Sequence, residues 1–462
     1  MQHQAAPLTR EQVKRIQPSQ VHDVLRRRLL VDGFDMVYDL DKSHGVYLHD
    51  SRTGKEYLDF FSFFASWPIS HNHPKMQDPE FLKQISKVAL HNPANSDIYT
   101  VEMAQFVATF ERVAMPPQFK HLFLVQGGTL AVENALKAAF DWKVRLNFAK
   151  GIKEERGKRV IHFKQAFHGR GGYTVSLTNT SDPRKWLYFP RFEDWPRVHN
   201  PKAIFPLEGE NLRRTIQEEE KSLSEIRDIL DKQGADIACI LLEPIQGEGG
   251  DNHFRPEYWQ ALRQLADQYD VLLIADEVQC GMGLTGKFWA YQHLGAVPDI
   301  ITFGKKSQVC GIMTTERIDR VPDNVFKVSS RINSTWGGNL VDMVRSRRFL
   351  EIIEEEDLVG NSARVGAHLL QGLLALQKQF PQLVNNTRGK GLLCSFDLAS
   401  PQVCSEVIGY AYEKGILLIS CGTQTIRFRP VLDSKKEDID TALAVLKEAL
   451  SAQTSKAQRA AL

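Results

Sequence analysis

The chain has 462 residues, of which 42% are hydrophobic and 25% are charged, and its formal net charge is +2. This length allows about three domain-sized units or one large α/β domain with a smaller companion, and the core can be large without disulfide support. The near-neutral charge gives no reason to expect nucleic acid or an anionic membrane as a partner.

The cysteines show no CxxC pair and no metal-like spacing with histidine, so we predict no metal site and a reducing compartment. The stretch 1–17 is polar and lacks the apolar segment of a secretory signal. No run is long and apolar enough to span a bilayer. These features predict a soluble, cytoplasmic protein. The small, polar residues 452–462 are expected to be frayed.

Strands alternate with helices through the middle of the chain, as in βαβ units with a largely parallel sheet. Segment 31–59 contains hairpin-like pieces. The residues after Gly128 show helical spacing of Val132, Leu136 and Ala139. Short runs rich in Ile, Leu and Val fit strands that are buried on both faces. The runs are 121–125, 160–163, 237–242, 271–275 and 298–303.

The charge-rich stretches 143–158 and 206–235 are expected to form solvated helices and connections. From about Val341 a long helical pattern is followed by strand-like pieces at 392–396 and 416–419, which indicates a smaller α+β domain. We therefore predict an α/β fold in three parts. They are an N-terminal segment (1–65) that packs with the small domain, a large domain (66–340) with a mainly parallel central sheet, and the small domain (341–462).

Two strand ends carry the residues with the clearest chemistry. Asp276 follows the apolar run 271–275, and Lys305 follows Gly304 at the end of the next such run. This pattern suits pyridoxal 5'-phosphate (PLP), because the lysine binds the cofactor covalently and the aspartate keeps the pyridine nitrogen protonated. Alternatively, Asp276 is a helix N-cap and Lys305–Lys306 is a solvated pair.

Other candidates for anion binding are scattered along the sequence. Gly127, Gly128 and Thr129 join a strand to a helix, where backbone N–H groups can bind phosphate, although an ordinary tight turn is the alternative. Thr335 has a hydroxyl and an N–H that can donate to phosphate, and its alternative is a simple polar turn.

Three further segments carry candidate binding or acidic groups. Phe167 could stack on a ring and Arg170 could bind a carboxylate, or the two are a core residue and a surface residue. Strand alternation puts Arg427 and Arg429 on one face, where either could reach a carboxylate or simply be solvated. Glu243 places an acid at another strand end.

In order and spacing these motifs resemble the class III, fold-type I PLP aminotransferases over residues 20–450. The motifs are Gly-Gly-Thr (127–129), Phe-His-Gly-Arg (167–170), Glu-Pro-Ile-Gln-Gly-Glu-Gly-Gly (243–250), Asp-Glu-Val-Gln (276–279), Gly-Lys (304–305) and Thr-Trp-Gly-Gly-Asn (335–339). Within that family, segments 130–143, 303–311 and 333–340 resemble the subfamily that acts on the ε-amino group of L-lysine.

The resemblance implies a role for each matching residue. Lys305 would bind PLP covalently, Asp276 would pair with the pyridine nitrogen, and Gln279 would bind the ring hydroxyl. Val278 and Phe167 would enclose the ring. The remaining implied roles are phosphate binding by Gly128 and Thr129, joined by Thr335 from the other subunit of a homodimer with shared active sites, and binding of the substrate α-carboxylate by Arg170.

The resemblance also implies transfer of the lysine ε-amino group to 2-oxoglutarate, giving 2-aminoadipate 6-semialdehyde and L-glutamate. Glu243 would cover Arg427, with Arg429 as the alternative, while lysine is bound, and would release it for 2-oxoglutarate. Ornithine or 4-aminobutyrate remain alternative donors, and Phe63 and Phe64 lie where they bear on substrate fit. A nicotinamide dehydrogenase is disfavoured because no GxGxxG follows a strand.

Overall fold

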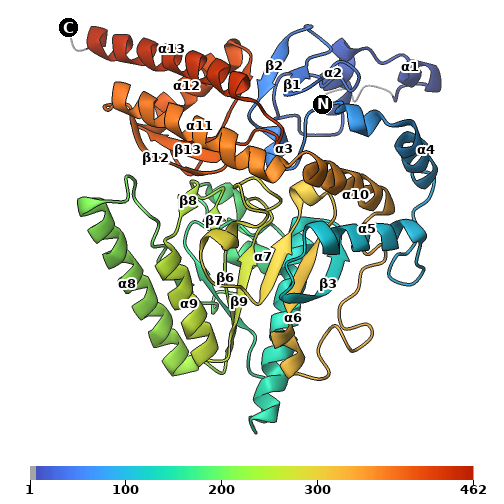
Figure 1. Cartoon of the computed structure of the whole chain (residues 1–462), viewed down its shortest axis with the longest axis vertical. Helices are drawn as coiled ribbons and strands as arrows, with labels where there is room; N and C mark the ends of the chain where they lie inside the picture. The colour runs from blue at the N-terminus through green and yellow to red at the C-terminus, as the bar shows by residue number, and fades with distance from the viewer. Residues whose placement is uncertain (1–6, 461–462) are drawn as a thin grey trace, which may run out of the picture.

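The computed structural model describes residues 7–460, so the first six residues of the polar N-terminal stretch and the last two residues of the chain lie outside it. A seven-stranded sheet lies in the lower half of the molecule as drawn in Figure 1. Its strands, in spatial order, are β3 (Phe119–Val125), β11 (Cys310–Thr315), β10 (Ile300–Phe303), β9 (Leu272–Asp276), β6 (Ile237–Leu242), β4 (Arg159–Phe163) and β5 (Arg197–Val198).

Neighbouring strands from β10 to β5 are parallel, and β11 runs antiparallel to both β10 and β3. The sheet is therefore mainly parallel, as predicted. Successive side chains of β9 enter different core clusters: Leu272 and Ile274 pack with α6, and Leu273 and Ala275 pack on the opposite face. Burial on both faces explains why these strands read as continuous apolar runs.

Helices cover both faces of this sheet (Figure 1). The long helix α6 begins after Gly127, whose φ of 97° is readily adopted by glycine. The bounds of the helices in this part of the chain are α4 (Pro79–Val88), α5 (Val101–Val113), α6 (Gly128–Ala149), α7 (Gly172–Leu177), α8 (Gly209–Gln233), α9 (Pro256–Gln268) and α10 (Leu340–Glu355).

The C-terminal part contains a four-stranded antiparallel sheet in the order β12 (Val384–Lys390), β13 (Leu393–Leu398), β16 (Thr425–Phe428) and β15 (Ile419–Cys421). Its helices are α11 (Leu358–Gln379), α12 (Pro401–Glu413) and α13 (Lys436–Ala460). Because α13 continues to Ala460, the prediction of a frayed segment from Ala452 is wrong for the described residues.

The N-terminal segment joins this C-terminal part. It contains α1 (Arg10–Lys14), α2 (Val21–Arg26), the hairpin of β1 (Tyr47–His49) and β2 (Glu56–Asp59), and the short turn α3 (Ser62–Ala65). Strand β14 (Ile416–Leu417) pairs with β2 in parallel. The predicted strand 416–419 is therefore split between two sheets, because β15 pairs with β16 instead.

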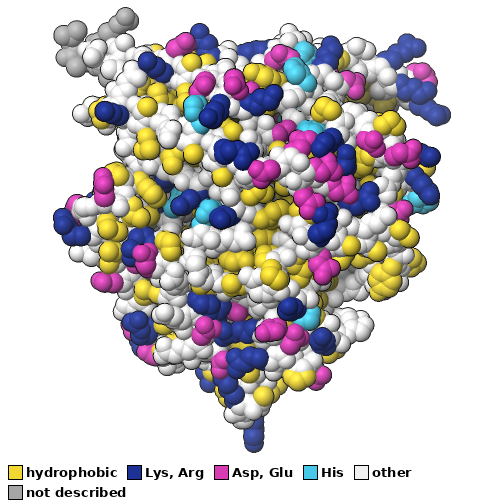
Figure 2. Space-filling model, viewed as in Figure 1, with side chains coloured by type: hydrophobic (Ala, Val, Ile, Leu, Met, Phe, Trp, Pro, Cys, Tyr) yellow, Lys and Arg dark blue, Asp and Glu magenta, His cyan; other side chains and the backbone are white. Residues whose placement is uncertain are grey.

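The surface agrees with the near-neutral charge. Figure 2 shows acidic and basic side chains interspersed over one face of the molecule. The six cysteines are all buried and free. In the part of the chain that the structure describes, no helix is long and apolar enough to cross a membrane.

Candidate active site

The carboxyl ends of the parallel strands open into a cavity of about 210 Å³. This edge of an α/β sheet is where such folds bind ligands. Asp276 ends β9 and Lys305 follows β10, so both predicted residues reach the cavity from neighbouring strands. The lining residues are Gly128, Thr129, Phe167, His168, Gly169, Glu243, Glu248, Asp276, Val278, Gln279 and Lys305.

Lys305 has a strained backbone and an ammonium group without a hydrogen-bond partner among residues 7–460. Its φ is 54°, in the left-handed region that non-glycine residues rarely adopt. Burial, with the positive charges of Arg427 and Arg429, lowers the pKa of Lys305 to about 8. An unpaired amino group at the cavity wall that loses its proton more readily than an ordinary lysine is suited to attack a carbonyl or accept a proton.

Lys306 is not part of a solvated surface pair, so that alternative is wrong. Its side chain is buried and its Nζ donates to the carbonyl oxygen of Ala65 at 2.7 Å. Lys306 therefore fastens the segment that carries Lys305 to the N-terminal turn α3.

Asp276 is held by three donors. Its Oδ2 lies 2.7 Å from Nδ1 of His168, and its Oδ1 accepts hydrogen bonds at 3.1 Å from the Thr302 hydroxyl and the Val278 N–H. The side chains of Asp276 and His168 are 5% and 0% exposed. The residue does not cap a helix, because a series of turns follows it. His168 was visible in the Phe-His-Gly-Arg motif, but spacing alone gave it no role.

The predicted cradle for a ring and a phosphate comes together at the start of α6. Glycine at position 128 leaves room there, because a Cβ would lie only 3.0 Å from Val278 Cγ1, a tight contact. Gly128 and Thr129 form the first turn of α6, where backbone N–H groups are free to bind an anion. Phe167 and Val278 line the same cavity.

The predicted pairing of Glu243 with an arginine is wrong. Glu243 is buried, and its oxygens accept backbone hydrogen bonds at 3.0 Å from Phe167 and Gly247, while no arginine of the described chain is paired with it. Burial raises the pKa of Glu243 to about 7. These short contacts fix Glu243 as a brace between two loops.

Glu248, five positions further along the same motif, has the partner that was expected for Glu243. Its Oε2 accepts a hydrogen bond at 2.8 Å from Nη2 of Arg427. Arg429 is paired with Asp251 instead. Both guanidinium groups also approach Oε1 of Gln279, at 3.4 Å for Arg427 and 3.3 Å for Arg429.

The sequence could not separate the two glutamates, because both lie in one glycine-rich motif. Glu248 stands between Gly247 and Gly249, and a Cβ at Gly247 would lie 2.0 Å from Gln279 Oε1. This contact is visible only in the structure, and the glycines on both sides of Glu248 are its one trace in the sequence.

Within the described chain, three predicted residues do not line the cavity: Arg427, which lies behind Glu248, and Arg170 and Thr335. Arg170 is exposed and follows His168 and Gly169, which do line it. Thr335 is exposed as well, and its carbonyl oxygen accepts a hydrogen bond at 3.3 Å from the Ser96 hydroxyl. Their proposed contacts with substrate and phosphate stay predictions.

The segment with Phe63 and Phe64 forms an unusual left-handed turn beside the arginines. Four successive residues, Ser62 to Ala65, have φ between 38° and 64°. This conformation costs about 1–2 kcal/mol per residue, so surrounding contacts must hold it. The Ser62 hydroxyl donates to the Arg429 carbonyl at 2.6 Å. The Arg427 guanidinium lies 5.9 Å from the centre of the Phe64 ring.

The site combines a half-buried lysine, a buried carboxylate on a neighbouring parallel strand, aromatic and aliphatic walls, and a helix N-terminus, and this set of groups fits PLP. The site thus defines a PLP-dependent enzyme. The aminotransferase class-III family model matches residues 31–450. The chain belongs to the class III aminotransferases, a family that depends on PLP, as the sequence motifs predicted.

Known relatives agree with this assignment. The chain is 49% identical to the L-lysine-epsilon aminotransferase of Mycobacterium tuberculosis H37Rv, covering 95% of this chain and 96% of the relative. It is 32% identical to human mitochondrial 4-aminobutyrate aminotransferase, covering 85% of this chain and 80% of the relative. The solved M. tuberculosis lysine aminotransferase superposes with a TM-score of 0.92 at 49% identity, covering 95% of this chain and all of that one.

Proposed function

We propose that the protein transfers the ε-amino group of L-lysine to 2-oxoglutarate and releases 2-aminoadipate 6-semialdehyde and L-glutamate. The observation that carries the proposal is Arg427, which lies buried next to the cavity and is covered by Glu248. Such a pair suits an enzyme whose two substrates differ in charge at one end. The 49% identity to a lysine-ε aminotransferase supports lysine as the donor.

The chain supplies acid–base and electrostatic groups to this chemistry. Bound PLP supplies an electron sink for the carbon that loses its proton. Lys305, with its lowered pKa of about 8, takes the proton from the substrate carbon that carries the reacting amine and can return it. The buried side chain of Asp276 is held in place by His168, where it can stabilise a positive ring nitrogen.

Other residues hold the reactants. We assign Phe167 and Val278 to the faces of the ring, and Gly128 and Thr129 to the phosphate. Their support is that all four line the cavity. Gln279 is assigned to the ring hydroxyl. Arg170 is assigned to the substrate α-carboxylate, since it follows residues of the cavity wall directly.

Glu248 takes the switching role that the sequence had suggested for Glu243. While lysine is bound, Glu248 neutralises Arg427, so no bare guanidinium lies near the reacting amine. When 2-oxoglutarate binds, Glu248 moves away and Arg427 binds the distal carboxylate. Uncovering one buried charge changes specificity strongly, because an unpaired buried charge is costly.

We further propose a homodimer with shared active sites. Thr335 is exposed and would reach the phosphate site of the partner subunit. Figure 2 shows hydrophobic side chains at the right of the face, near α5 in Figure 1. The large hydrophobic side chains of this region that are more than half exposed are Leu90, Ile98, Tyr99 and Val101. Such an apolar surface is suited to a protein partner.

The domain division and location are likewise proposals. The pairing of β14 with β2 supports grouping residues 1–65 with the small domain (341–462), apart from the large domain (66–340). Six buried free cysteines fit a cytoplasmic location, where thiols remain reduced.

Incubation of the purified enzyme with lysine and 2-oxoglutarate tests the proposal. The expected result is glutamate together with the semialdehyde, trapped as its cyclic imine. Ornithine and 4-aminobutyrate serve as rival donors in the same assay. If either rival is turned over faster than lysine, that rival is the donor, and the protein is still an aminotransferase.

A further inference from the structure

A second cation meets the Glu248–Arg427 pair. Lys185 ends the short helical turn Pro183–Lys185, and its ammonium group forms an ion pair with Oε1 of Glu248. Arg427 binds the other oxygen, Oε2, at 2.8 Å. The side chains of Lys185 and Glu248 are 15% and 23% exposed. One carboxylate at the cavity wall is thus shared by two cations from distant parts of the chain.

The segment with Lys185 is linked to the backbone of Glu248 through Gly422. The Ser181 hydroxyl donates to the carbonyl of Gly422 at 2.9 Å, and the Gly422 N–H donates to the carbonyl of Glu248 at 2.9 Å. The Lys185 ammonium also lies 5.8 Å from the centre of the Phe167 ring, which lines the cavity. Lys185 is therefore positioned by the fold, unlike a freely moving surface lysine.

We propose that Lys185 is a specificity-determining residue that retains the Glu248 carboxylate when Glu248 leaves Arg427. This inference rests on the proposed function, because it concerns how the second substrate is admitted. An unpaired, partly buried carboxylate is unfavourable. Lys185 keeps that carboxylate paired at the cavity wall, so a ligand carboxylate can take Arg427.

The contribution of Lys185 differs between the two states. With Arg427 covered, Glu248 has two cationic partners, and loss of one leaves the other. With Arg427 occupied by a ligand, Lys185 is the cation that remains for Glu248. Removal of Lys185 therefore disfavours the open state more than the covered state, and ligands with two carboxylates should lose affinity selectively.

Two simple ligands separate these states in the PLP-loaded enzyme. Glutarate carries a carboxylate at each end, and pentanoate has the same chain length with one carboxylate. For Lys185→Gln we expect glutarate to bind about tenfold more weakly, a value between those of exposed and buried ion pairs. Pentanoate affinity should change less than twofold. Calorimetric titration, or the change in cofactor absorbance, gives both dissociation constants.

Two further variants control for charge and for folding. Lys185→Arg keeps the cation and should bind glutarate much as the wild type does. Arg184→Gln removes the neighbouring cation, which is 88% exposed and paired with Asp182, and should change neither affinity. Melting temperature and cofactor content verify folding, and Lys185→Met is used if Lys185→Gln is unstable. Unchanged glutarate binding, or equal weakening of both ligands, would overturn the inference.

A double variant separates action through Glu248 from direct contact with the ligand. In a Glu248→Gln background, adding Lys185→Gln should alter glutarate affinity less than twofold, because the charge that Lys185 retains is gone. A full tenfold loss in that background would show that Lys185 binds the ligand itself. The donor assay on the wild type is separate, so failure of lysine as donor leaves the test of Lys185 intact.

Discussion

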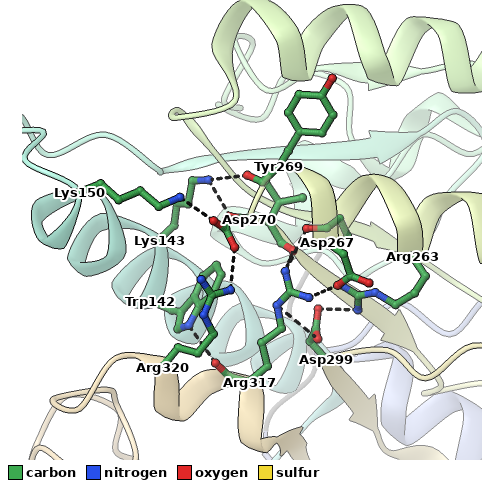
Figure 3. A network of polar contacts seen from close by, with 12 residues as sticks. Trp142, Lys143, Lys150, Arg263, Asp267, Tyr269, Asp270, Asp299, Arg317 and Arg320 are labelled. Atoms are coloured by element: carbon green, nitrogen blue, oxygen red, sulfur yellow. Dashed lines mark hydrogen bonds and ion pairs between the residues drawn. The ribbon is translucent and has the colours of Figure 1, made fainter.

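Two lysines, the half-buried Lys305 and the buried Lys143, lie at opposite edges of the seven-stranded sheet. Lys305 follows β10 at the carboxyl edge, whereas Lys143 projects from α6 toward Tyr269 and Asp270, which precede β9 (Figure 3). Burial lowers the pKa of both lysines to about 8. A lowered lysine pKa therefore does not by itself mark an active site in this molecule.

The partners of the two ammonium groups make the difference. Lys143 donates to the carbonyl oxygens of Tyr269 at 3.2 Å and Asp270 at 2.7 Å, and its side chain is 2% exposed. Lys305 has no such acceptor among the described residues and faces a cavity. The buried Lys143, with two acceptors, joins a helix to a loop, whereas the half-buried Lys305, without an acceptor, is available for chemistry.

The surroundings repeat this contrast. Around Lys143, Asp270 is paired with Lys150 at 2.6 Å and with Arg320 at 2.7 Å (Figure 3). Asp299 accepts hydrogen bonds at 2.8 Å from Arg263 and from the Leu273 N–H. The charges here bind one another, whereas at the carboxyl edge Lys305 faces an open cavity without a hydrogen-bond partner among the described residues.

The largest expected effect is on Lys305. Lys305→Ala should lower transamination by at least about 10³-fold, because covalent attachment and proton transfer are both lost. Lys143→Met should keep turnover per folded active site within about twofold. Steady-state rates and borohydride reduction followed by peptide mapping check both statements. If borohydride reduction attached the cofactor to Lys306 or Lys143 in the wild type, Lys305 would not be the reactive lysine.

Buried acids at the two edges give the next test. Asp276→Asn should slow turnover by about 10²-fold or more while PLP stays bound, because the ring nitrogen loses its charge partner. Asp299→Asn should lower the melting temperature and leave turnover per folded site nearly unchanged. Near-normal turnover in Asp276→Asn would show that Asp276 has only a structural role.

Glu248 and Glu243 allow the same comparison within one motif. Glu248→Ala should raise the glutamate-to-lysine rate ratio about tenfold, because a bare Arg427 favours donors with a distal carboxylate. Glu243→Gln should leave the ratio unchanged, since Glu243 binds backbone N–H groups. Single-turnover rates with each donor measure the ratio. A changed rate ratio in Glu243→Gln, with an unchanged ratio in Glu248→Ala, would show that Glu243 and not Glu248 covers Arg427.

The smallest effect concerns stability alone. The pKa of Lys143 is about 8 in the folded protein against an ordinary 10.5. Between these values the unfolded chain holds more protons on Lys143, so this group makes the unfolding free energy rise with pH. Relative to Lys143→Met, the wild type should gain up to about 1 kcal/mol per pH unit there. Denaturant unfolding at pH 8 and 10 measures this difference, and parallel pH curves would contradict it.

Much of the carboxyl edge could be predicted from local sequence. Runs 237–242 and 271–275 became β6 and β9 because apolar side chains are buried on both faces. Parallel strands end at the same edge, so Asp276 and Lys305 had to meet there. The strands and the proximity of Asp276 to Lys305 therefore follow from local apolar runs and from the direction of the strands.

Other features depend on contacts between distant segments. Lys143 lies in a charge-rich stretch that was expected to be solvated, yet it is buried because the loop at Tyr269 and Asp270 covers it. The left-handed turn at 62–65 is stabilised by hydrogen bonds with the carbonyl of Arg429 and the ammonium group of Lys306. The choice between Glu243 and Glu248 followed from how the backbone at 247–250 turns toward Arg427.

Isotope transfer tests the central claim most directly. The wild-type enzyme is incubated with 2-oxoglutarate and lysine that carries ¹⁵N at either the ε or the α position, and the glutamate is analysed by mass spectrometry. Lysine labelled at the ε position should give ¹⁵N-glutamate, and lysine labelled at the α position should give unlabelled glutamate. Label arriving from the α position, or no label from either, would contradict ε-amino transfer.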